Sequence, residues 1–158
     1  MKFSIVKGCL ALVIATTSIP VGEVLTLAQT SSGSVATVAS AGTLDIGRDH
    51  FINVQAQRVP LERLRIVCVT FHKFSGIKVI DQATGQTIAH TVNIGFEEIT
   101  ITFNKPIPVG ETVRVVMENS TVRGIGEGIT VPYRIFAYSN TFGEIPIGTA
   151  LVRTPSKD

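Results

Sequence analysis

The sequence predicts an all-β domain, an immunoglobulin-like β-sandwich of about seven strands, and three observations support this prediction. Apolar and polar residues alternate strictly over residues 98–103, which places successive side chains on opposite faces of a strand. Short apolar segments recur between turn residues about every 8 to 12 positions, a spacing typical of sandwich domains. Charged residues form only 16% of the chain, and no sustained helical periodicity is present. A partly open β-barrel is the alternative fold.

Residues 1–28 have the layout of a cleavable secretory signal peptide. Lys2 and Lys7 precede an uncharged apolar stretch, and Thr26 and Ala28 occupy the two positions that signal peptidase reads before the bond after Ala28. The apolar stretch is shorter than the about 20 residues that a membrane-spanning helix needs. We therefore expect an exported protein, periplasmic or extracellular, with no stable membrane span after cleavage.

Composition divides the rest of the chain. Residues 39–41, Ala-Ser-Ala, form a second possible cleavage motif, but they lie far from the apolar stretch. Residues 29–44 are small and mostly polar, which is typical of a flexible leader. The predicted organisation is a signal peptide at 1–28, a flexible leader at 29–44, a β-sandwich domain at 45–153 and a tail at 154–158. A single domain of this size can bury a core without a metal or a disulfide.

The first half of the predicted domain supplies a central strand and a hairpin. Residues 66–69 are apolar on both sides, which favours a central position in a sheet. Residues 77–81 and 87–92 predict a hairpin, because Gly85 between them takes a positive φ without the steric penalty of other residues. Residues 60–64 are compatible with one helical turn, since proline is tolerated at a first helical position.

The second half of the domain supplies the other strands. The alternating strand at 98–103 is expected to end before Pro106 and Pro108, which cannot donate hydrogen bonds to a ladder. The pattern then predicts strands at 112–118, 131–138 and 147–152, the last two separated by the turn residues Asn140, Gly143 and Pro146.

Three segments of the domain form a recognisable set. They are Pro60-Leu61 leading into Leu64-Arg65-Ile66, then Ile101-Thr102-Phe103-Asn104-Lys105-Pro106-Ile107-Pro108-Val109-Gly110-Glu111-Thr112-Val113, then Tyr133-Arg134-Ile135-Phe136-Ala137-Tyr138. Over about residues 55 to 153, the chain resembles the secreted cyanobacterial proteins grouped as domain of unknown function 2808. That family has no established activity, so the resemblance implies only secretion and a β fold and assigns no functional residue.

Cys68 is the cysteine that remains after cleavage, since Cys9 lies in the signal peptide. It is either a redox or dimerising thiol or a small buried core side chain, and we favour the second because free cysteine is among the most buried residue types. We expect no shared metal ion with His72, because four residues span about 13 Å in a strand, whereas zinc–ligand bonds are about 2 Å long. His50 and His90 are isolated, so no metal site and no cofactor are predicted.

The sequence contains no recognisable catalytic motif. A Gly-x-Ser-x-Gly nucleophile elbow is missing. Glu97 and Glu98 are neighbours, so on a strand they point to opposite faces and cannot flank one glycosidic bond. The glycine-rich residues 124–128 lack the spacing of a dinucleotide fingerprint. Together with Arg123 they are either a recognition loop or a long connection. No catalytic or cofactor-binding residue is predicted.

Two further patterns allow a functional and a structural interpretation. Tyr133, Phe136, Tyr138 and Phe142 lie close in sequence and could stack on a sugar ring, although aromatic residues in strands more often belong to the core. Residues 119–121, Asn-Ser-Thr, have the form of a glycosylation acceptor. In a host that does not glycosylate exported proteins, they are an ordinary turn.

These observations predict an exported, non-enzymatic β domain that binds an unknown protein or glycan partner or contributes to the cell envelope. The alternative is a secreted hydrolase whose catalytic groups come from distant strands. A homo-oligomeric surface layer or fibre is a third hypothesis. The formal net charge of +2 argues against a nucleic-acid partner, because nucleic-acid modules present a strongly basic face.

Overall fold

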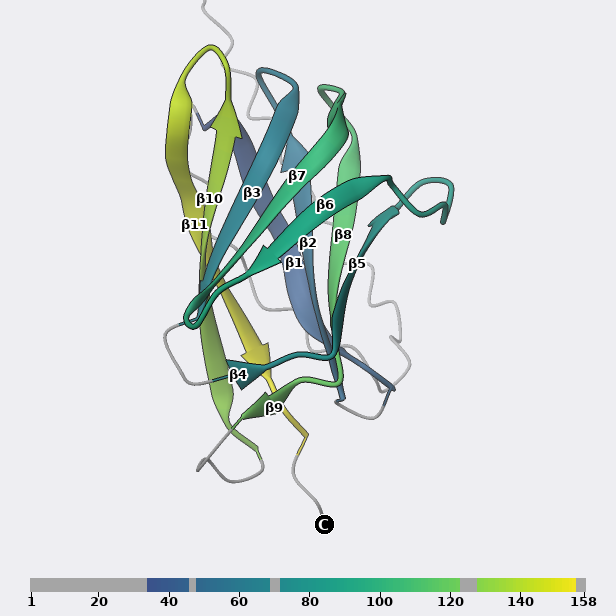
Figure 1. Ribbon diagram of the computed structural model, residues 1–158, viewed down its shortest axis with the longest axis vertical. Helices are drawn as coiled ribbons and strands as arrows, with labels where there is room; N and C mark the ends of the chain where they lie inside the picture. Colours follow the sequence, from purple (N-terminus) through teal and green to yellow (C-terminus); the bar gives the residue numbers. More distant parts are fainter. Residues whose placement is uncertain (1–33, 46–47, 69–71, 123–127, 156–158) are drawn as a thin grey trace, which may run out of the picture.

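The chain folds into β-strands that form two facing sheets. The computed structural model describes residues 34–45, 48–68, 72–122 and 128–155, and these contain eleven strands and no α-helix. Figure 1 shows the two large sheets packed face to face. The strands are β1 (Ala36–Leu44), β2 (Asp49–Ala56), β3 (Leu61–Cys68), β4 (His72–Lys73), β5 (Gly76–Asp81), β6 (His90–Ile94), β7 (Glu98–Ile107), β8 (Thr112–Glu118), β9 (Thr121–Val122), β10 (Thr130–Ser139) and β11 (Gly143–Arg153).

The strand order confirms the predicted all-β sandwich. One sheet has the order β1-β2-β8-β5, the facing sheet has the order β11-β10-β3-β7-β6, and β4 pairs with β9 in a separate two-stranded sheet. All pairs are antiparallel. The first two strands lie in one sheet and β3, β10 and β11 in the other, as in an immunoglobulin sandwich. Neither sheet closes into a barrel, so the alternative fold is wrong, and the described strands outnumber the predicted seven.

The core lies between the two large sheets, where alternate residues of each strand face inward. β3 is central in its sheet, as predicted. It contributes Leu64, Ile66 and Cys68 to the core, and β8 in the other large sheet contributes Val113, Val115 and Met117. Burying an aliphatic side chain of this size stabilises a fold by about 1.5–3 kcal/mol, so this layer supplies the main driving force for the sandwich.

The predicted flexible leader is wrong for residues 36–44, which form β1. This strand pairs with β2, and Ala36, Val38 and Ala41 are buried. The pairing shifts between Val38 and Ser40, so an extra residue interrupts the two-residue period and conceals the strand in the sequence. The domain therefore includes residues that were assigned to the leader. Residues 1–33, which contain the predicted signal peptide and the start of the leader, lie outside the described part of the chain.

The predicted hairpin at 77–92 forms only at its tip. Gly85 has φ +72°, as expected for the turn. Ile80 and Thr87 form an isolated bridge, and the Ile88 N–H donates to the Val79 carbonyl oxygen at 2.9 Å. After Ile88 the chain crosses to the facing sheet, where β6 pairs with β7 instead of β5. A turn signal identifies a reversal, but it does not determine how far the two arms remain paired.

Proline had less influence on the strands than the sequence suggested. The predicted helical turn at residues 60–64 is wrong, because β3 begins at Leu61, directly after Pro60. β7 continues through Pro106 to Ile107, so the expected end of that strand before Pro106 is also wrong. The side chain of Pro106 is exposed. No helix in the described segments is long and apolar enough to cross a membrane.

Candidate functional site

A buried polar cluster joins the two large sheets. The hydroxyl of Tyr133 in β10 and Nδ1 of His50 in β2 share a hydrogen bond of 2.5 Å, and the Ser120 hydroxyl lies 3.3 Å from the same nitrogen. The two rings meet edge to face with their centroids 5.9 Å apart. Burial raises the pKa of Tyr133, so its hydroxyl stays protonated. These residues lie far apart in the sequence, and no motif connects them.

This cluster has the residue types of an active site but not the access. A hydrolase assembled from distant strands would need its histidine in contact with substrate. The His50 side chain is only 1% exposed and Tyr133 is fully buried. Asp49, the adjacent carboxylate, accepts a hydrogen bond from the Asn119 backbone N–H at 2.9 Å. The buried hydrogen bond between His50 and Tyr133 instead fixes one sheet relative to the other.

Cys68 lies in the core beside Tyr133, so the prediction of a buried side chain is confirmed. It is 4% exposed and pairs with Tyr133 across β3 and β10. Burial raises the pKa of its thiol to about 12. The thiolate is the nucleophilic form of cysteine, and this environment suppresses it.

The predicted absence of a metal site concerns three histidines in different places. His72 begins β4, and residues 69–71 between it and Cys68 lie outside the described segments. His90 is half-buried, and its Nδ1 lies 2.6 Å from the Ile88 carbonyl oxygen. Among the described residues, no group of three or more His, Cys, Asp or Glu side chains is placed to hold a metal ion.

The four aromatic residues near the C-terminus do not form one stacking surface. Tyr133 is in the core, whereas Phe136 and Tyr138 lie half-buried on the outer face of the five-stranded sheet. Phe142 is 52% exposed and lies between β10 and β11. A sugar ring could not contact all four together.

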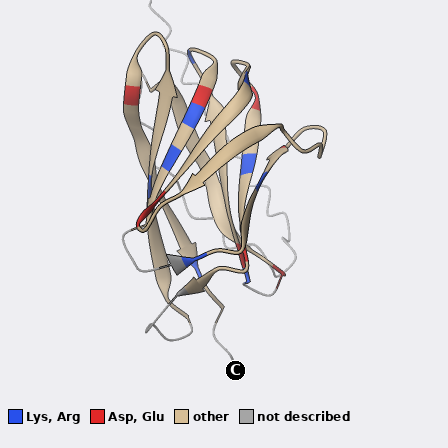
Figure 2. Ribbon diagram, viewed as in Figure 1, with Lys and Arg blue, Asp and Glu red and all other residues tan. Residues whose placement is uncertain are grey.

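Arginine side chains cover the outer face of the five-stranded sheet. The Arg63 guanidinium lies 4.2 Å from the centre of the Tyr138 ring, and that of Arg65 lies 4.1 Å from the centre of the Phe136 ring. Both contacts join residues paired across β3 and β10. Figure 2 shows two basic segments on β3, in the middle of the sheet, and an acidic segment directly next to the upper one. We call Arg63, Arg65, Arg134, Phe136 and Tyr138 the arginine face.

Ion pairs fix the centre of the arginine face. Arg65 Nη2 lies 2.5 Å from Glu144 Oε1 in β11, and Arg65 Nη1 lies 3.3 Å from Glu98 Oε2 in β7. Their hydrogen bonds, chiefly the one between Arg65 and Glu144, raise the pKa of Arg65 and lower that of Glu144. Glu98, which the sequence excluded as half of a glycosidase pair with Glu97, is an ion-pair partner of Arg65.

Arg63 and Arg134 donate no guanidinium hydrogen bond to the residues that the structure describes. Arg63 contacts the Tyr138 ring but makes no hydrogen bond through its guanidinium to any described residue. Arg134 is exposed and has no ion-pair partner there. Sequence reasoning missed both residues, although the signal is present. In β3 and β10, arginine and aromatic residues alternate with buried positions, so they must share one outer face.

Two segments that the sequence singled out are the glycine-rich residues 124–128 and the possible glycosylation acceptor at residues 119–121. Residues 123–127, which include Arg123 and most of the glycine-rich stretch, lie outside the described segments, and Gly128 has φ +75°. Asn119 is exposed with φ +49°, and its side-chain amide donates to the Ser75 hydroxyl at 2.8 Å. The possible glycosylation acceptor therefore lies on an exposed turn after β8.

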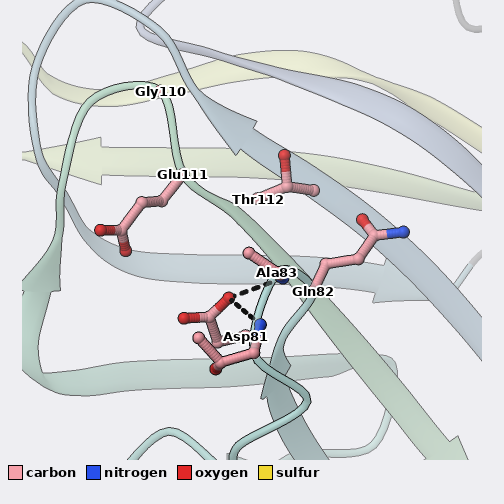
Figure 3. Close-up of a pocket in the computed structure, with 7 residues that line it drawn as sticks. Asp81, Gln82, Ala83, Gly110, Glu111 and Thr112 are labelled. Carbon is pink, nitrogen blue, oxygen red and sulfur yellow. Dashed lines mark hydrogen bonds between the residues drawn. The ribbon is translucent and has the colours of Figure 1, made fainter.

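A shallow hollow of about 490 Å³ lies between the turns that follow β5 and β7 (Figure 3). The Asp81 carboxylate accepts hydrogen bonds from the N–H groups of Ala83 at 2.8 Å and Thr84 at 3.3 Å, which lower its pKa. Asp81 thus closes its own turn. It and Glu111 are the only carboxylates in the lining, which gives little basis for a ligand site. The lining residues are Asp81, Gln82, Ala83, Thr84, Gly110, Glu111 and Thr112.

Three comparisons relate this chain to family models, curated proteins and solved structures. No family model matches it, and no curated protein matches it. A solved structure titled BspA_C_WT is similar with 12% sequence identity and a TM-score of 0.41. The match covers 77% of this chain and 46% of that chain, so this chain spans about half the length of the matched structure. The resemblance to domain of unknown function 2808 stays a prediction.

Proposed function

We propose that this chain is an exported, non-enzymatic domain that binds a protein partner through the arginine face. The observation that carries the proposal is the pair of Arg–aromatic stacks on the outer face of the five-stranded sheet. Arginine and aromatic residues are enriched at protein interfaces and supply most of their binding energy. Because the described residues accept no hydrogen bond from the guanidinium groups of Arg63 and Arg134, the partner should offer carboxylates.

A protein surface fits this site better than a neutral glycan. Sugar rings bind by stacking on open aromatic faces, whereas here a guanidinium group covers one face of Phe136 and of Tyr138. Planar guanidinium groups match carboxylates geometrically. Acidic side chains of a protein supply such groups at close spacing.

Export is supported by the signal-like residues 1–28 and by the position of β1. Cleavage after residue 41 would remove Ala36 and Val38, which are buried in the sandwich. Cleavage after Ala28 leaves β1 complete, so the first site is compatible with the fold. The possible hydrolase site at His50 lacks access for a substrate, and this supports a non-enzymatic role.

The test uses the mature chain recovered from the periplasm or the culture fluid, with Gln29 expected as its first residue. Its binding to a polyglutamate peptide is measured by calorimetry at low and high salt. We expect binding that weakens with salt, because the contacts are exposed charges. Replacing Arg63 and Arg134 by Gln should weaken it by about fivefold or more.

The matched control is Lys78→Gln, which removes an exposed charge from the other sheet, where Lys78 pairs with Glu118. This variant should bind like the wild type. Equal binding by the double variant, or no binding by the wild type, contradicts the proposal. Polygalacturonate and dextran test the glycan alternative, and tighter binding of either would reassign the partner class. A first residue other than Gln29 would revise the cleavage site.

A further inference from the structure

Among the described residues, no strand pairs with the outer edge of β6, the last strand of the five-stranded sheet. Two hydrogen bonds define which of its residues face β7: the Gly95 N–H donates to the Glu98 carbonyl oxygen at 2.8 Å, and the Asn104 N–H donates to the Ala89 carbonyl oxygen at 3.0 Å. Antiparallel strands alternate between bonded and non-bonded pairs. In the β6–β7 register, Thr91 and Asn93 therefore bond to β7. The backbone N–H and carbonyl groups of residues 90, 92 and 94 therefore point away from β7, toward the outer edge of the sheet.

The corresponding edge of the facing sheet is closed by the chain itself. β5 is the last strand there, and residues 86–88 run along its outer side. The Asp81 N–H donates to the Gln86 carbonyl oxygen at 2.9 Å, and the Val79 carbonyl oxygen accepts from the Ile88 N–H. The returning chain thus occupies the positions where another strand could pair. Figure 1 shows β5 and β6 at the same side of the sandwich, each at the margin of its sheet.

The two edges on the other side are also protected. β1 and β11 contact each other across the sandwich. The β1 pairing shifts between Val38 and Ser40, and the β10–β11 pairing shifts between Ile135 and Phe136, opposite Gly148 with φ +147°. Such bulges twist an edge and prevent the addition of a flat strand.

β6 has none of these protections. It is His90-Thr91-Val92-Asn93-Ile94, without a lysine, arginine, aspartate, glutamate, proline or glycine, and its pairing with β7 is regular. Natural proteins usually protect edges with lysine, proline or a bulge. Ile94 is 49% exposed. It lies on the same sheet face as Ile99, which is opposite it in β7 and belongs to the core.

We propose that β6 pairs antiparallel with β6 of a second copy of this chain. A twofold axis at Val92 would place Val92 beside its equivalent and His90 beside Ile94 of the second copy. Each outward residue would then both donate and accept a backbone hydrogen bond. Such symmetry brings equal or nearby residues together, so like charges would oppose it. β6 contains no lysine, arginine, aspartate or glutamate and so meets this condition, and Val92 and Ile94 of the two copies would cover each other.

The pairing joins the two five-stranded sheets into one continuous sheet. The side chains of Thr91 and Asn93 lie on the outer face of the sheet. In the dimer they would form one polar row with those of the second copy, without an apolar interruption. The arginine face lies on β3 and β10, and β7 separates these strands from β6. Dimerisation would therefore leave that face accessible, and this inference does not depend on the proposed partner.

The test is analytical ultracentrifugation of the mature chain from micromolar to millimolar concentration. We expect a reversible dimer. Ile94→Lys introduces the charge that natural edges use and should weaken dimerisation about tenfold or more. The matched control is Val109→Lys, because Val109 is also an exposed aliphatic residue, 50% against 49%, and lies in the β7–β8 turn. This variant should dimerise like the wild type.

Hydrogen exchange of the wild type at low and high concentration locates the contact without any variant. The amides of Val92 and Ile94 should become protected as the dimer forms, whereas those of Thr91 and Asn93, already bonded to β7, should not change. A monomer at all concentrations, a dimer that Ile94→Lys leaves intact, or protection confined to other strands would each overturn the proposal. The first result would leave the edge open to an extended segment of a different protein.

Discussion

The polar contact inside the sandwich and the polar contacts on its outer face differ in what surrounds them. His50 and Tyr133 meet between the two sheets, where both side chains are almost fully buried. Arg65 and Glu144 meet on one sheet, where their side chains are 26% and 34% exposed. Inside a protein, water cannot replace a lost partner, whereas on the surface it does so readily.

The difference separates a structural role from the binding role proposed for the arginine face. The buried contact links β2 to β10 and so fixes one sheet relative to the other. The exposed ion pair adds little to stability. It holds a guanidinium over the Phe136 ring and thereby shapes a surface. In this fold, a solvent-exposed polar residue is therefore a better candidate for partner binding than a buried one.

The largest effect is expected for His50→Leu. The change removes a hydrogen-bond partner of the buried Tyr133 hydroxyl, and we expect the free energy of unfolding to fall by about 2 kcal/mol. Urea denaturation measures this loss. The matched control is His90→Leu, since His90 is half-buried and its ring contacts a backbone carbonyl oxygen within its own segment. If the two variants lose the same stability, the cross-sheet contact has no special role.

An intermediate effect is expected from Cys68 at alkaline pH. Burial raises the pKa of its thiol from 9.0 to about 12. The unfolded chain therefore loses this proton first, and the contribution of Cys68 to stability is complete below pH 9 and is lost as the pH rises toward 12. At pH 10 the loss is about 1.4 kcal/mol.

Urea denaturation of wild type and Cys68→Ala at pH 8 and pH 10, under reducing conditions, isolates this contribution. Burial, the main cause of the raised pKa of Tyr133, acts in both proteins, so its hydroxyl stays protonated in both folded states and contributes equally to the difference. The stability of the wild type should fall more steeply with pH than that of the variant. Parallel pH profiles would show that the Cys68 thiol is not buried in solution.

The sequence was sufficient for the regular part of the fold. The strict alternation at residues 98–103 identified β7, and residues 112–118 coincide with β8. Both strands pair without interruption along these segments, so the two-residue period is unbroken. Gly85 was also assigned correctly, because the positive φ of a turn is a local property.

The rest required information that is not local. β1 was missed because a bulge breaks its period and because its small residues pack where β11 comes close. His50, Tyr133 and Ser120 could not be grouped, since only the sandwich topology brings them together. The arginine face could have been found if β3 and β10 had been recognised as neighbours. The two strands lie far apart in the sequence, however, and no local pattern shows that they pair.

The smallest effect on stability is expected for Glu144→Gln, on the arginine face. Arg65 lowers the pKa of Glu144, so the ion pair stabilises the fold above the ordinary pKa of a glutamate, and this contribution is lost as the pH falls through the lowered value. Because the pair is exposed, the variant should lose less than about 1 kcal/mol at neutral pH. Its stability should also change less than that of the wild type between pH 7 and pH 3.

Binding should respond in the opposite direction to stability. Glu144→Gln removes a negative charge from the arginine face and releases N–H groups of Arg65, so polyglutamate should bind about twofold more tightly or better. Glu118→Gln is the matched control, because it breaks an exposed ion pair with Lys78 on the other sheet. That variant should leave binding unchanged. Weaker binding by Glu144→Gln would mean that the fixed position of Arg65 matters more than its free donors. The N–H groups that bind the carboxylates of the partner would then be those of Arg63 and Arg134 alone.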